Sequence, residues 1–343
     1  MATIRDVATR AGVAPSSVTR VLSGHPNVSP ELRDRVLAAV HEVGYKPDLV
    51  AAGLRRGYTQ TVGIIVNDVL SPVIAQMIDI VESELRKAGY GVILANSHGQ
   101  SANDVENVRL LHQRRVDALL TSFADDRNPE LTATLSALPI PVVLLDREID
   151  SHEFSAVISD HRMGARLLGE HLLERGHREI AIISGPVSAH PSRSRVEGLR
   201  EVLSKRGVPL RPEFQIAGRG SEEFGVNAVT QLMEDPHPPT AIVIGNGNTS
   251  AVAGVIAELR RRGVRIGEDI ALAGSDDAPL MALHTPGITV ISRDVGDLAS
   301  RAANLLLNRL EHGTVGVHTV VLPTHLIIRP STDWTLATAV RAS

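Results

Sequence analysis

Four polar side chains close to the start of the chain have the types and spacing to read DNA. They are Ser16, Ser17, Thr19 and Arg20. Hydroxyl groups can hydrogen-bond to base edges, and an arginine can bond the O6 and N7 atoms of guanine bidentately. If this segment is a helix, its leading turns present these groups together, which suits a DNA major groove. DNA is therefore the expected partner, and a merely solvated face of a small helical appendage is the alternative.

Two short helices separated by a glycine are expected to position these groups. Thr3 can cap the first helix, with Asp6 three residues later in a capping-box position. Gly12 then supplies the tight turn, and Pro15 suits the first turn of the second helix because its missing N–H costs nothing there. The apolar faces of the two helices share one core, formed by Ile4, Val7, Ala8, Ala11, Val18, Val21 and Leu22. The pattern predicts a helix-turn-helix.

A third helix is expected to complete a small bundle. Ser29 caps it, Pro30 and Glu31 occupy its first turn, and Gly44 ends it. Its buried stripe consists of Leu32, Val36, Ala39, Val40 and Val43. Three helices within about 45 residues bury only a marginal core, so we expect DNA or the rest of the chain to stabilise them.

Residues 3–24 resemble the opening of the lactose-repressor/galactose-repressor (LacI/GalR) family of bacterial transcription regulators. The family pattern is roughly T-x-x-D-V-A-x-x-A-G-V-S-x-x-T-V-S-R-V-L-N-x, and this chain departs from it at Ala14, Ser17, Thr19 and Ser23. The likeness continues at Val28-Ser29, Arg33, Val36 and Gly44-Tyr45-Lys46-Pro47. The resemblance implies that Pro15 and Ser16 select operator base pairs and that Arg20 contacts a base. Ala14 replaces the usual serine cap, a change worth about 1 kcal/mol of helix stability.

Composition and charge fit a globular protein with a basic head. The chain has 343 residues, 43% of them hydrophobic, without an apolar run of the ~18 residues that a membrane span needs and without the apolar core of a signal peptide. It contains no cysteine, which excludes disulfides and thiolate metal sites and fits a cytoplasmic location. Residues 1–60 contain eight Lys or Arg and five Asp or Glu, against 27 and 34 in residues 61–343. This division favours a DNA-binding head on an acidic body.

Residues 47–58 can form a two-turn helix between head and body. Helices below ~12–15 residues are marginal in water, so we expect this one to fold only when paired with its twin on DNA; an ordinary linker is the alternative. The resemblance implies that Leu54 enters the minor groove, where an apolar wedge unstacks a base step. Asp48 replaces the family's usual asparagine and Ala52 a common arginine, which leaves the base preference open. The candidate DNA-contacting residues are Thr3, Pro15, Ser16, Ser17, Thr19, Arg20 and Leu54.

From residue 61 onward, short apolar strands alternate with amphipathic helices. This pattern is typical of an α/β body of doubly wound parallel sheets with helices on both faces. The expected strands are 62–67, 91–96, 117–122, 141–145, 180–184, 214–218, 241–245, 270–274 and 288–292. Two such sheets suggest two lobes, with a ligand bound outside the carboxyl ends of the strands.

The middle of the chain resembles the same family. The matching residues are Val157-Ile158-Ser159-Asp160, Gly164-Ala165, His171-Leu172-Leu173, Gly176-His177-Arg178, Ile180, Gly185-Pro186 and Gly274-Ser275-Asp276-Asp277. The likeness extends from Thr3 to about Thr332 and implies a body like that of periplasmic sugar-binding proteins. The expected divisions are a head at 1–46, a hinge at 47–60, a body at 61–333 and a tail at 334–343. The N-lobe is expected at 61–160 and 293–321, and the C-lobe at 161–292 and 322–333.

Polar residues that follow strands are the expected contacts of a small effector. The resemblance aligns Asp146, Arg195, Asn246 and Asp276 with effector-holding positions; Ser71 and Asp160 are weaker candidates. Carboxylates accept hydrogen bonds, arginine donates them and an amide does both, so the set suits a hydroxylated ligand. Each residue also has a structural alternative, such as a loop cap, a surface cation or a turn.

Departures from the family bear on the ligand. Val73 and Ile74 stand where purine-sensing members use stacking aromatics, and Gly220 stands where sugar-sensing members often have tryptophan or phenylalanine. The remaining aromatic candidates, for which a place in the core is the stronger interpretation, are Phe123, Phe154 and Phe224. The pocket is therefore expected to lack the aromatic side chains on which ligands of other family members stack.

Arg293 is a further departure, at a position where glutamine is frequent. Together with Arg195 it could grip a carboxylate or phosphate bidentately, or it could neutralise Asp146 or Asp276. The expected effector is small and polar, a sugar or sugar derivative, and an anionic group on it is left open.

Two other classes of protein compete with a regulator. The strand and loop at 241–248 resemble a dinucleotide-binding fingerprint, so an NAD-dependent enzyme with a fused helical head is one alternative, although Ser250 replaces the third glycine. A sugar-binding protein with such a head is the other. The histidines show no metal-ligand spacing, and His177 is interpreted as structural, so neither metal nor cofactor is expected.

The expectation is a transcription regulator, of the repressor type, and not an enzyme. We expect it to act as a homodimer on pseudo-palindromic operator DNA, because two heads need two chains. No membrane partner is expected. A small effector is expected to switch its affinity for the operator through closure of the two lobes. The identity of the effector, the operator sequence and the direction of the switch stay open.

Overall fold

The computed structural model describes residues 2–22, 25–45, 57–151, 153–313 and 316–333. The chain divides into two compact units, residues 1–59 and 60–343. The hinge residues Asp48, Ala52 and Leu54 and the tail from 334 lie outside the described ranges. The structure therefore does not test the predicted hinge helix.

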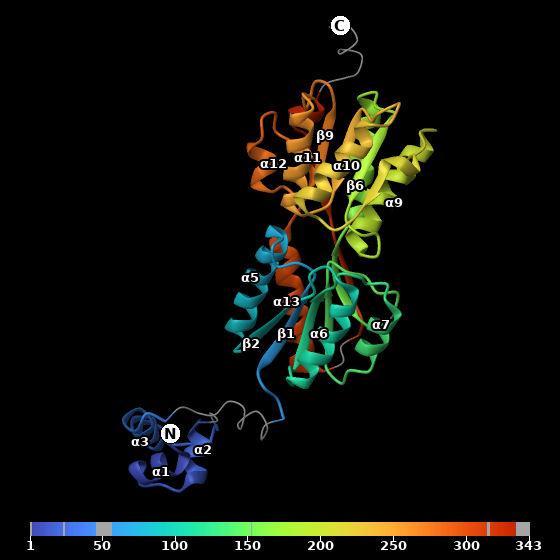
Figure 1. The fold of residues 1–343 in the computed structure, drawn as a ribbon. Helices are drawn as coiled ribbons and strands as arrows, with labels where there is room; N and C mark the ends of the chain where they lie inside the picture. The colour runs from blue at the N-terminus through green and yellow to red at the C-terminus, as the bar shows by residue number, and fades with distance from the viewer. Residues whose placement is uncertain (1, 23–24, 46–56, 152, 314–315, 334–343) are drawn as a thin grey trace. The chain divides into compact units, whose positions relative to one another are not determined.

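The first unit is a three-helix bundle (Figure 1). Its helices are α1 (Ile4–Ala11), α2 (Pro15–Leu22) and α3 (Pro30–Val43). The predicted capping box is present: the Thr3 N–H donates to Asp6 Oδ2 at 2.7 Å, and the Asp6 N–H donates to Thr3 Oγ1 at 3.4 Å. Gly12 turns the chain with φ 64°. The bundle buries Val7, Ala8, Ala11, Val18, Val21, Val36 and Ala39.

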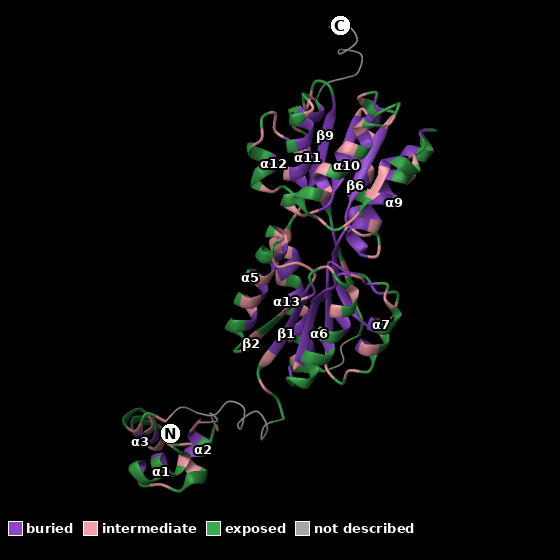
Figure 2. Cartoon of the chain, viewed as in Figure 1, coloured by how far each residue is buried: buried purple, intermediate pink, exposed green. Residues whose placement is uncertain are grey.

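The second unit contains two lobes, each built on a six-stranded sheet. In the first, called the N-lobe, all strands are parallel, in the order β11-β5-β4-β3-β1-β2. The strands are β1 (Thr61–Val66), β2 (Gly91–Asn96), β3 (Ala118–Ser122), β4 (Val142–Leu145), β5 (Ser155–Ser159) and β11 (Thr319–Leu322). Helices α5 (Pro72–Lys87) and α13 (Val295–His312) cover one face, and α6 (Ser101–Gln113) and α7 (Pro129–Ser136) the other. Figure 2 shows the buried strands between these helices.

The second lobe, called the C-lobe, repeats this plan. Its strand order is β12-β10-β9-β8-β6-β7. The strands are β6 (Ile180–Ser184), β7 (Gln215–Ala217), β8 (Ala241–Gly245), β9 (Ala271–Ser275), β10 (Thr289–Arg293) and β12 (Thr324–Ile327). The helices are α8 (His161–Glu174), α9 (His190–Lys205), α10 (Glu222–Met233), α11 (Thr249–Arg261) and α12 (Pro279–Leu283), with single 3-10 turns at Pro212–Phe214 and Pro330–Thr332. One apolar cluster joins α8 and α9 to the sheet, and another joins α10 and α11.

Three of these strands, β5, β11 and β12, were not among the expected ones. Both β11 and β12 are short edge strands with few buried residues. β12 lacks the apolar run that marks a central strand, whereas β11 contains a short one, Val320-Val321-Leu322. β12 runs antiparallel to β10, with Val290 opposite Ile327, so the second sheet is mixed and not purely parallel. The chain passes between the lobes at β5 to α8, at β10 to α13 and at β11 to β12.

Candidate functional site

A cavity of about 300 Å³ lies between the two lobes, where residues that follow the strands meet. The N-lobe supplies residues after β1, β2, β3 and β4, and the C-lobe supplies residues after β6, β8 and β9. Open parallel sheets bind ligands at this edge. Eight of the nine predicted contacts line the cavity, namely Ser71, Val73, Asp146, Arg195, Gly220, Asn246, Asp276 and Arg293.

Asp160 is the ninth, and the structure places it elsewhere. Its carboxylate accepts a hydrogen bond from the Met163 N–H at 2.9 Å and so caps α8. It borders a separate groove between the lobes and not the cavity. The expectation for Asp160 is corrected because the residue that follows β5 is also the N-cap of α8, and capping occupies its carboxylate.

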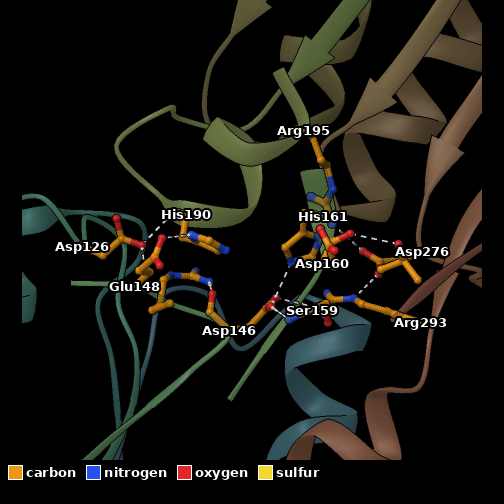
Figure 3. Close-up of polar contacts among 12 residues, drawn as sticks. Asp126, Asp146, Glu148, Ser159, Asp160, His161, His190, Arg195, Asp276 and Arg293 are labelled. Carbon is orange, nitrogen blue, oxygen red and sulfur yellow. Dashed lines mark hydrogen bonds and ion pairs between the residues drawn. The ribbon is translucent and has the colours of Figure 1, made fainter. Parts of the chain in front are cut away.

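Arg293 joins one aspartate from each lobe (Figure 3). Its Nε donates to Asp276 Oδ1 at 2.6 Å, and its Nη1 donates to Asp146 Oδ2. The three side chains are 8%, 7% and 4% exposed. Of the two interpretations of Arg293, neutralisation of the aspartates is the one that the structure shows.

Burial and ion pairing act in opposite directions on this cluster. Burial disfavours the ionised form of Asp146, but Arg293, His161 and Arg147 together outweigh it and hold the pKa of Asp146 well below its usual range. Burial lowers the pKa of His161 to about 4, so this imidazole is neutral at pH 7. Its Nε2–H donates to Asp146 Oδ1 at 2.9 Å, and the Ser159 N–H donates to the same oxygen at 3.1 Å. The carboxylate of Asp146 therefore receives three donors from the protein itself.

Two buried polar atoms of cavity-lining residues have no hydrogen-bond partner within the described part of the chain. Arg195 donates from Nη1 to the carbonyl of Gly245 at 3.1 Å, and its Nη2 lies 3.7 Å from Asp276 Oδ2, but its Nε–H is unpaired. The other atom is Asn67 Oδ1, an acceptor. Buried donors and acceptors are normally satisfied. A ligand hydroxyl can both donate and accept a hydrogen bond, so it could pair with either atom.

Hydrogen bonds between residues that line the cavity join the two lobes. Asn248 Nδ2 donates to Asp68 Oδ2 at 3.2 Å, and Arg219 Nη2 donates to the carbonyl of His98. The two lobes are therefore in direct contact beside the cavity, through residues that line it.

Several polar lining residues were not predicted. They are Asn67, Asp68, His98, Arg147, Ser192, Arg219 and Asn248. Asn67 and Asp68 directly follow the first strand, and Asn248 lies two residues after a predicted contact, so position alone could have indicated these three. Arg219 follows a strand of only three residues, which gives a weak signal.

The cavity has no phenylalanine, tyrosine or tryptophan in its described lining. Phe123 and Phe154 are buried in the N-lobe core, and Phe224 packs against the C-lobe core, so their interpretation as core residues is confirmed. A Cβ at Gly220 would lie 2.5 Å from the Cβ of Asn248. The surrounding residues therefore leave no room for a ring at this position.

The dinucleotide-like loop does not form a phosphate cradle. Asn248 caps α11, accepting from the Ser250 N–H at 2.8 Å. A Cβ at Gly247 would meet Asp276 Oδ2 at 2.9 Å, so a carboxylate lies where a phosphate would have to approach. His177 is buried, with its Nδ1 3.0 Å from Thr240 Oγ1, which fits a structural residue.

Helix α2 presents most of the predicted DNA-reading groups to solvent. Pro15, Ser16, Thr19 and Arg20 are exposed, whereas Ser17 is half-buried and not fully outward as expected. Thr19 Oγ1 donates to the carbonyl of Pro15 at 3.1 Å. Thr3 belongs to the capping box of α1, and Leu54 lies outside the described residues.

The described residues contain no group of three or more His, Cys, Asp or Glu side chains arranged to hold a metal ion. None of their helices is long and apolar enough to cross a membrane.

Comparison with known proteins assigns both units. Residues 3–48 match the model of bacterial regulatory proteins of the lacI family, and residues 170–332 match that of periplasmic binding protein-like domains. The chain is 30% identical over 332 residues to the HTH-type transcriptional repressor PurR of Proteus mirabilis (strain HI4320), covering 96% of this chain and 97% of the relative. It is 29% identical over 315 residues to the ribose operon repressor of Escherichia coli (strain K12), covering 92% and 95%.

Solved structures show the same likeness. The lac repressor dimer bound to operator and the anti-inducer ONPF superposes with a TM-score of 0.84 at 26% identity, covering 96% of this chain and 99% of that one. The complex of the transcriptional regulator CelR with cellobiose gives a TM-score of 0.71 at 27% identity, covering 96% and 100%. These relatives are regulators and not enzymes. The chain belongs to the lacI family of bacterial regulatory proteins and is a DNA-binding transcriptional regulator with an effector-binding body.

Proposed function

We propose that this regulator is a repressor controlled by a small, neutral, polyhydroxylated effector bound in the interlobe cavity. The observation that supports this most directly is the pair of unsatisfied buried atoms, Arg195 Nε and Asn67 Oδ1, beside a cavity of about 300 Å³. That volume is at the lower end of the range of small-molecule sites. An effector of monosaccharide size fits it better than a larger ligand.

The charge pairing within the cavity favours a neutral effector. Arg293 is shared between two buried carboxylates, and Arg195 lies next to one of them. A carboxylate or phosphate on the ligand would have to break these internal pairs. A planar purine would find no aromatic ring to stack on within the described lining.

Thermal-shift screening followed by calorimetry tests this effector class. The full chain is titrated with ribose, glucose and galactose, with gluconate and ribose 5-phosphate, and with hypoxanthine and guanine. We expect a neutral sugar to bind tightest. Tight binding of a sugar acid or phosphate, with the neutral sugar inactive, would show that the effector is anionic, and tight binding of a purine alone would contradict a polyhydroxylated ligand.

The active form is proposed to be a symmetric homodimer on a pseudo-palindromic operator. Exposed apolar side chains occur on β2, on the loop before α5 and on α12, where Leu70 is 83% and Leu283 82% exposed; the others are Ile93, Leu94 and Leu280. Figure 1 shows β2, α5 and α12 on the same side of the second unit. Such a two-lobed apolar face suits self-association about a two-fold axis, and two heads would then read two half-sites.

Sedimentation velocity and in vitro selection test the dimer and its operator. Leu283→Arg is expected to shift the chain toward monomers, whereas Leu110→Arg, at an exposed leucine of α6, should leave the dimer intact. Selection from a random duplex pool should enrich inverted repeats. A monomeric wild-type chain, or enrichment of sites without two-fold symmetry, would rule out this arrangement.

A further inference from the structure

Helix α9 begins without a cap from its own segment. Its N-cap residue, Ala189, has no side-chain oxygen, and His190 and Pro191 open the helix. The first N–H groups of a helix lack partners within the helix, and its N-terminus favours negative charge. Both Ala189 and His190 are buried, so water is not freely available to take the place of a cap.

A carboxylate from the other lobe supplies this cap (Figure 3). Asp126 lies in the N-lobe, in the segment between β3 and α7. Its Oδ2 accepts from the His190 N–H at 2.7 Å, and its Oδ1 accepts from Arg193 Nη1 at 3.1 Å. Asp126 is only 2% exposed. Glu148 of the N-lobe adds a second contact, with its Oε2 3.0 Å from His190 Nδ1.

The capped end of α9 is also a wall of the ligand cavity. Ser192 and Arg195, in its first two turns, line the cavity, and so does Ala124, two residues before Asp126. Separation of the lobes would pull the carboxylate away from His190 and Arg193 and would move Arg195 relative to the N-lobe wall. The cap is therefore available only when the lobes are close together.

We propose that Asp126 is a positioning residue that stabilises the closed arrangement of the two lobes by capping α9 across the lobe interface. Most helix caps are local and stabilise only their own helix. This cap joins the two lobes, so it links the position of Arg195 to the N-lobe. The N-lobe begins with β1, which follows the DNA-binding head in the chain. The link does not depend on which effector the cavity holds.

Electron paramagnetic resonance distance measurements on the full chain test this role. The chain has no cysteine, so Glu106→Cys on α6 and Glu223→Cys on α10, both exposed, place one spin label on each lobe. We expect Asp126→Ala to shift the label distances to longer values. Asp126→Asn keeps an acceptor for the His190 N–H and loses the charge, so an intermediate distribution is expected. An unchanged distribution in both variants would overturn the proposal.

Two further variants separate lobe closure from helix stability. Asn128→Ala removes a cap within the N-lobe, where Asn128 Oδ1 accepts from the Glu130 N–H at 2.9 Å; it should lower the melting temperature without changing the label distances. Ala189→Ser, added to Asp126→Ala, gives α9 a local cap and should recover part of the melting temperature but not the closed distances. If it restores the distances, Asp126 acts only as a helix cap. Should Asp126→Ala fail to fold, Asp126→Asn decides the outcome. Failure here would leave the proposed effector class and dimer untouched, because neither ligand nor DNA enters the measurement.

Discussion

Asp146 and Asp276 occupy equivalent places in the two lobes and adopt the same unusual backbone. Each directly follows a central strand, with φ of 54° and 67°, in the left-handed region that non-glycine residues rarely adopt. The Asp146 N–H donates to Val157 O at 2.8 Å, and the Asp276 N–H donates to Ile291 O at 2.9 Å. The repeated turn brings both carboxylates to Arg293. Backbone strain of this kind concentrates at functional sites, which fits the position of both residues in the cavity wall.

Replacing Arg293 by methionine is expected to destabilise the body strongly. The change leaves two buried carboxylates without their shared cation, and breaking a buried pair in this way costs about 3–5 kcal/mol. In the wild type, the depressed pKa of Asp146 stabilises the folded chain. This stabilisation is present at pH values above the ordinary pKa of aspartate and is lost as the pH falls through the pKa that Asp146 has in the folded chain. In the variant the buried carboxyls can protonate as the pH falls. The difference in free energy of unfolding should therefore be largest at pH 7 and smaller near pH 4.

Urea denaturation of both proteins across this pH range measures the effect. Arg301→Met is the matched control, because Arg301 is 54% exposed and pairs with Asp297 on the surface of α13 at 2.8 Å. Its cost should stay below about 1 kcal/mol. Equal costs for the two arginines would contradict the importance of the buried cluster.

Asp104 is expected to make stability fall as the pH rises from about 4 to 7. Burial raises the pKa of Asp104 to about 6, although its carboxylate accepts from the N–H groups of Ala124 at 2.9 Å and Asp125 at 3.2 Å. Because the folded chain binds this proton more tightly than the unfolded chain, protonation favours folding. This contribution to the free energy of unfolding is fully present at pH values below the pKa of Asp104 in the unfolded chain, and it is lost as the pH rises through 6. The loss amounts to about 3 kcal/mol.

The variant Asp104→Asn should lack this component of the pH dependence. The measurement is the slope of the free energy of unfolding against pH between 4 and 7, compared between wild type and variant. Asp125→Asn, at the half-buried neighbouring carboxyl, should keep the wild-type slope. Identical slopes for wild type and Asp104→Asn would show that Asp104 does not titrate in this range.

Gly198→Ala should destabilise the C-lobe by forcing α8 and α9 apart. A Cβ at Gly198 would lie 2.3 Å from the backbone oxygen of Arg162, which cannot move independently of α8. Overpacking of this kind costs about 1–3 kcal/mol. Gly296→Ala is the control: its new Cβ would have its nearest contact at 3.3 Å, from Asp294 Oδ1, and alanine favours helix. Thermal melting should separate the two, and a stabilising Gly198→Ala would contradict the close helix contact.

Local patterns predicted the head and most of the central strands because the responsible residues are neighbours in sequence. Thr3, Asp6 and Gly12 specify the first helix and its end within ten residues. The edge strand β12 could not be recognised in this way, since its position depends on pairing with β10, more than 30 residues earlier. Its four residues contain no apolar run of their own.

Cavity-lining residues were predicted correctly where a residue follows a strand and has no other structural role. The prediction was wrong where the residue also caps a helix. Asp146 and Asp276 follow central strands and line the cavity. Asp160 follows β5 just as directly, but it begins α8 and its carboxylate caps that helix. Whether Arg293 served an anion or neutralised aspartates could not be decided from sequence, because its two partners come from different lobes.

Leu54→Ala is expected to weaken specific operator binding while leaving effector affinity nearly unchanged. The prediction rests on the sequence of the hinge, which lies outside the described residues. Loss of a buried leucine side chain is worth about 1.5–3 kcal/mol, and each 1.4 kcal/mol is roughly a tenfold change in affinity, so operator affinity should fall about ten- to hundredfold. Fluorescence anisotropy on a selected duplex and calorimetry with the effector measure the two affinities. Leu37→Ala, at an exposed leucine of α3, should change neither. Equal loss of both affinities in Leu54→Ala would show that hinge and cavity do not have separate roles.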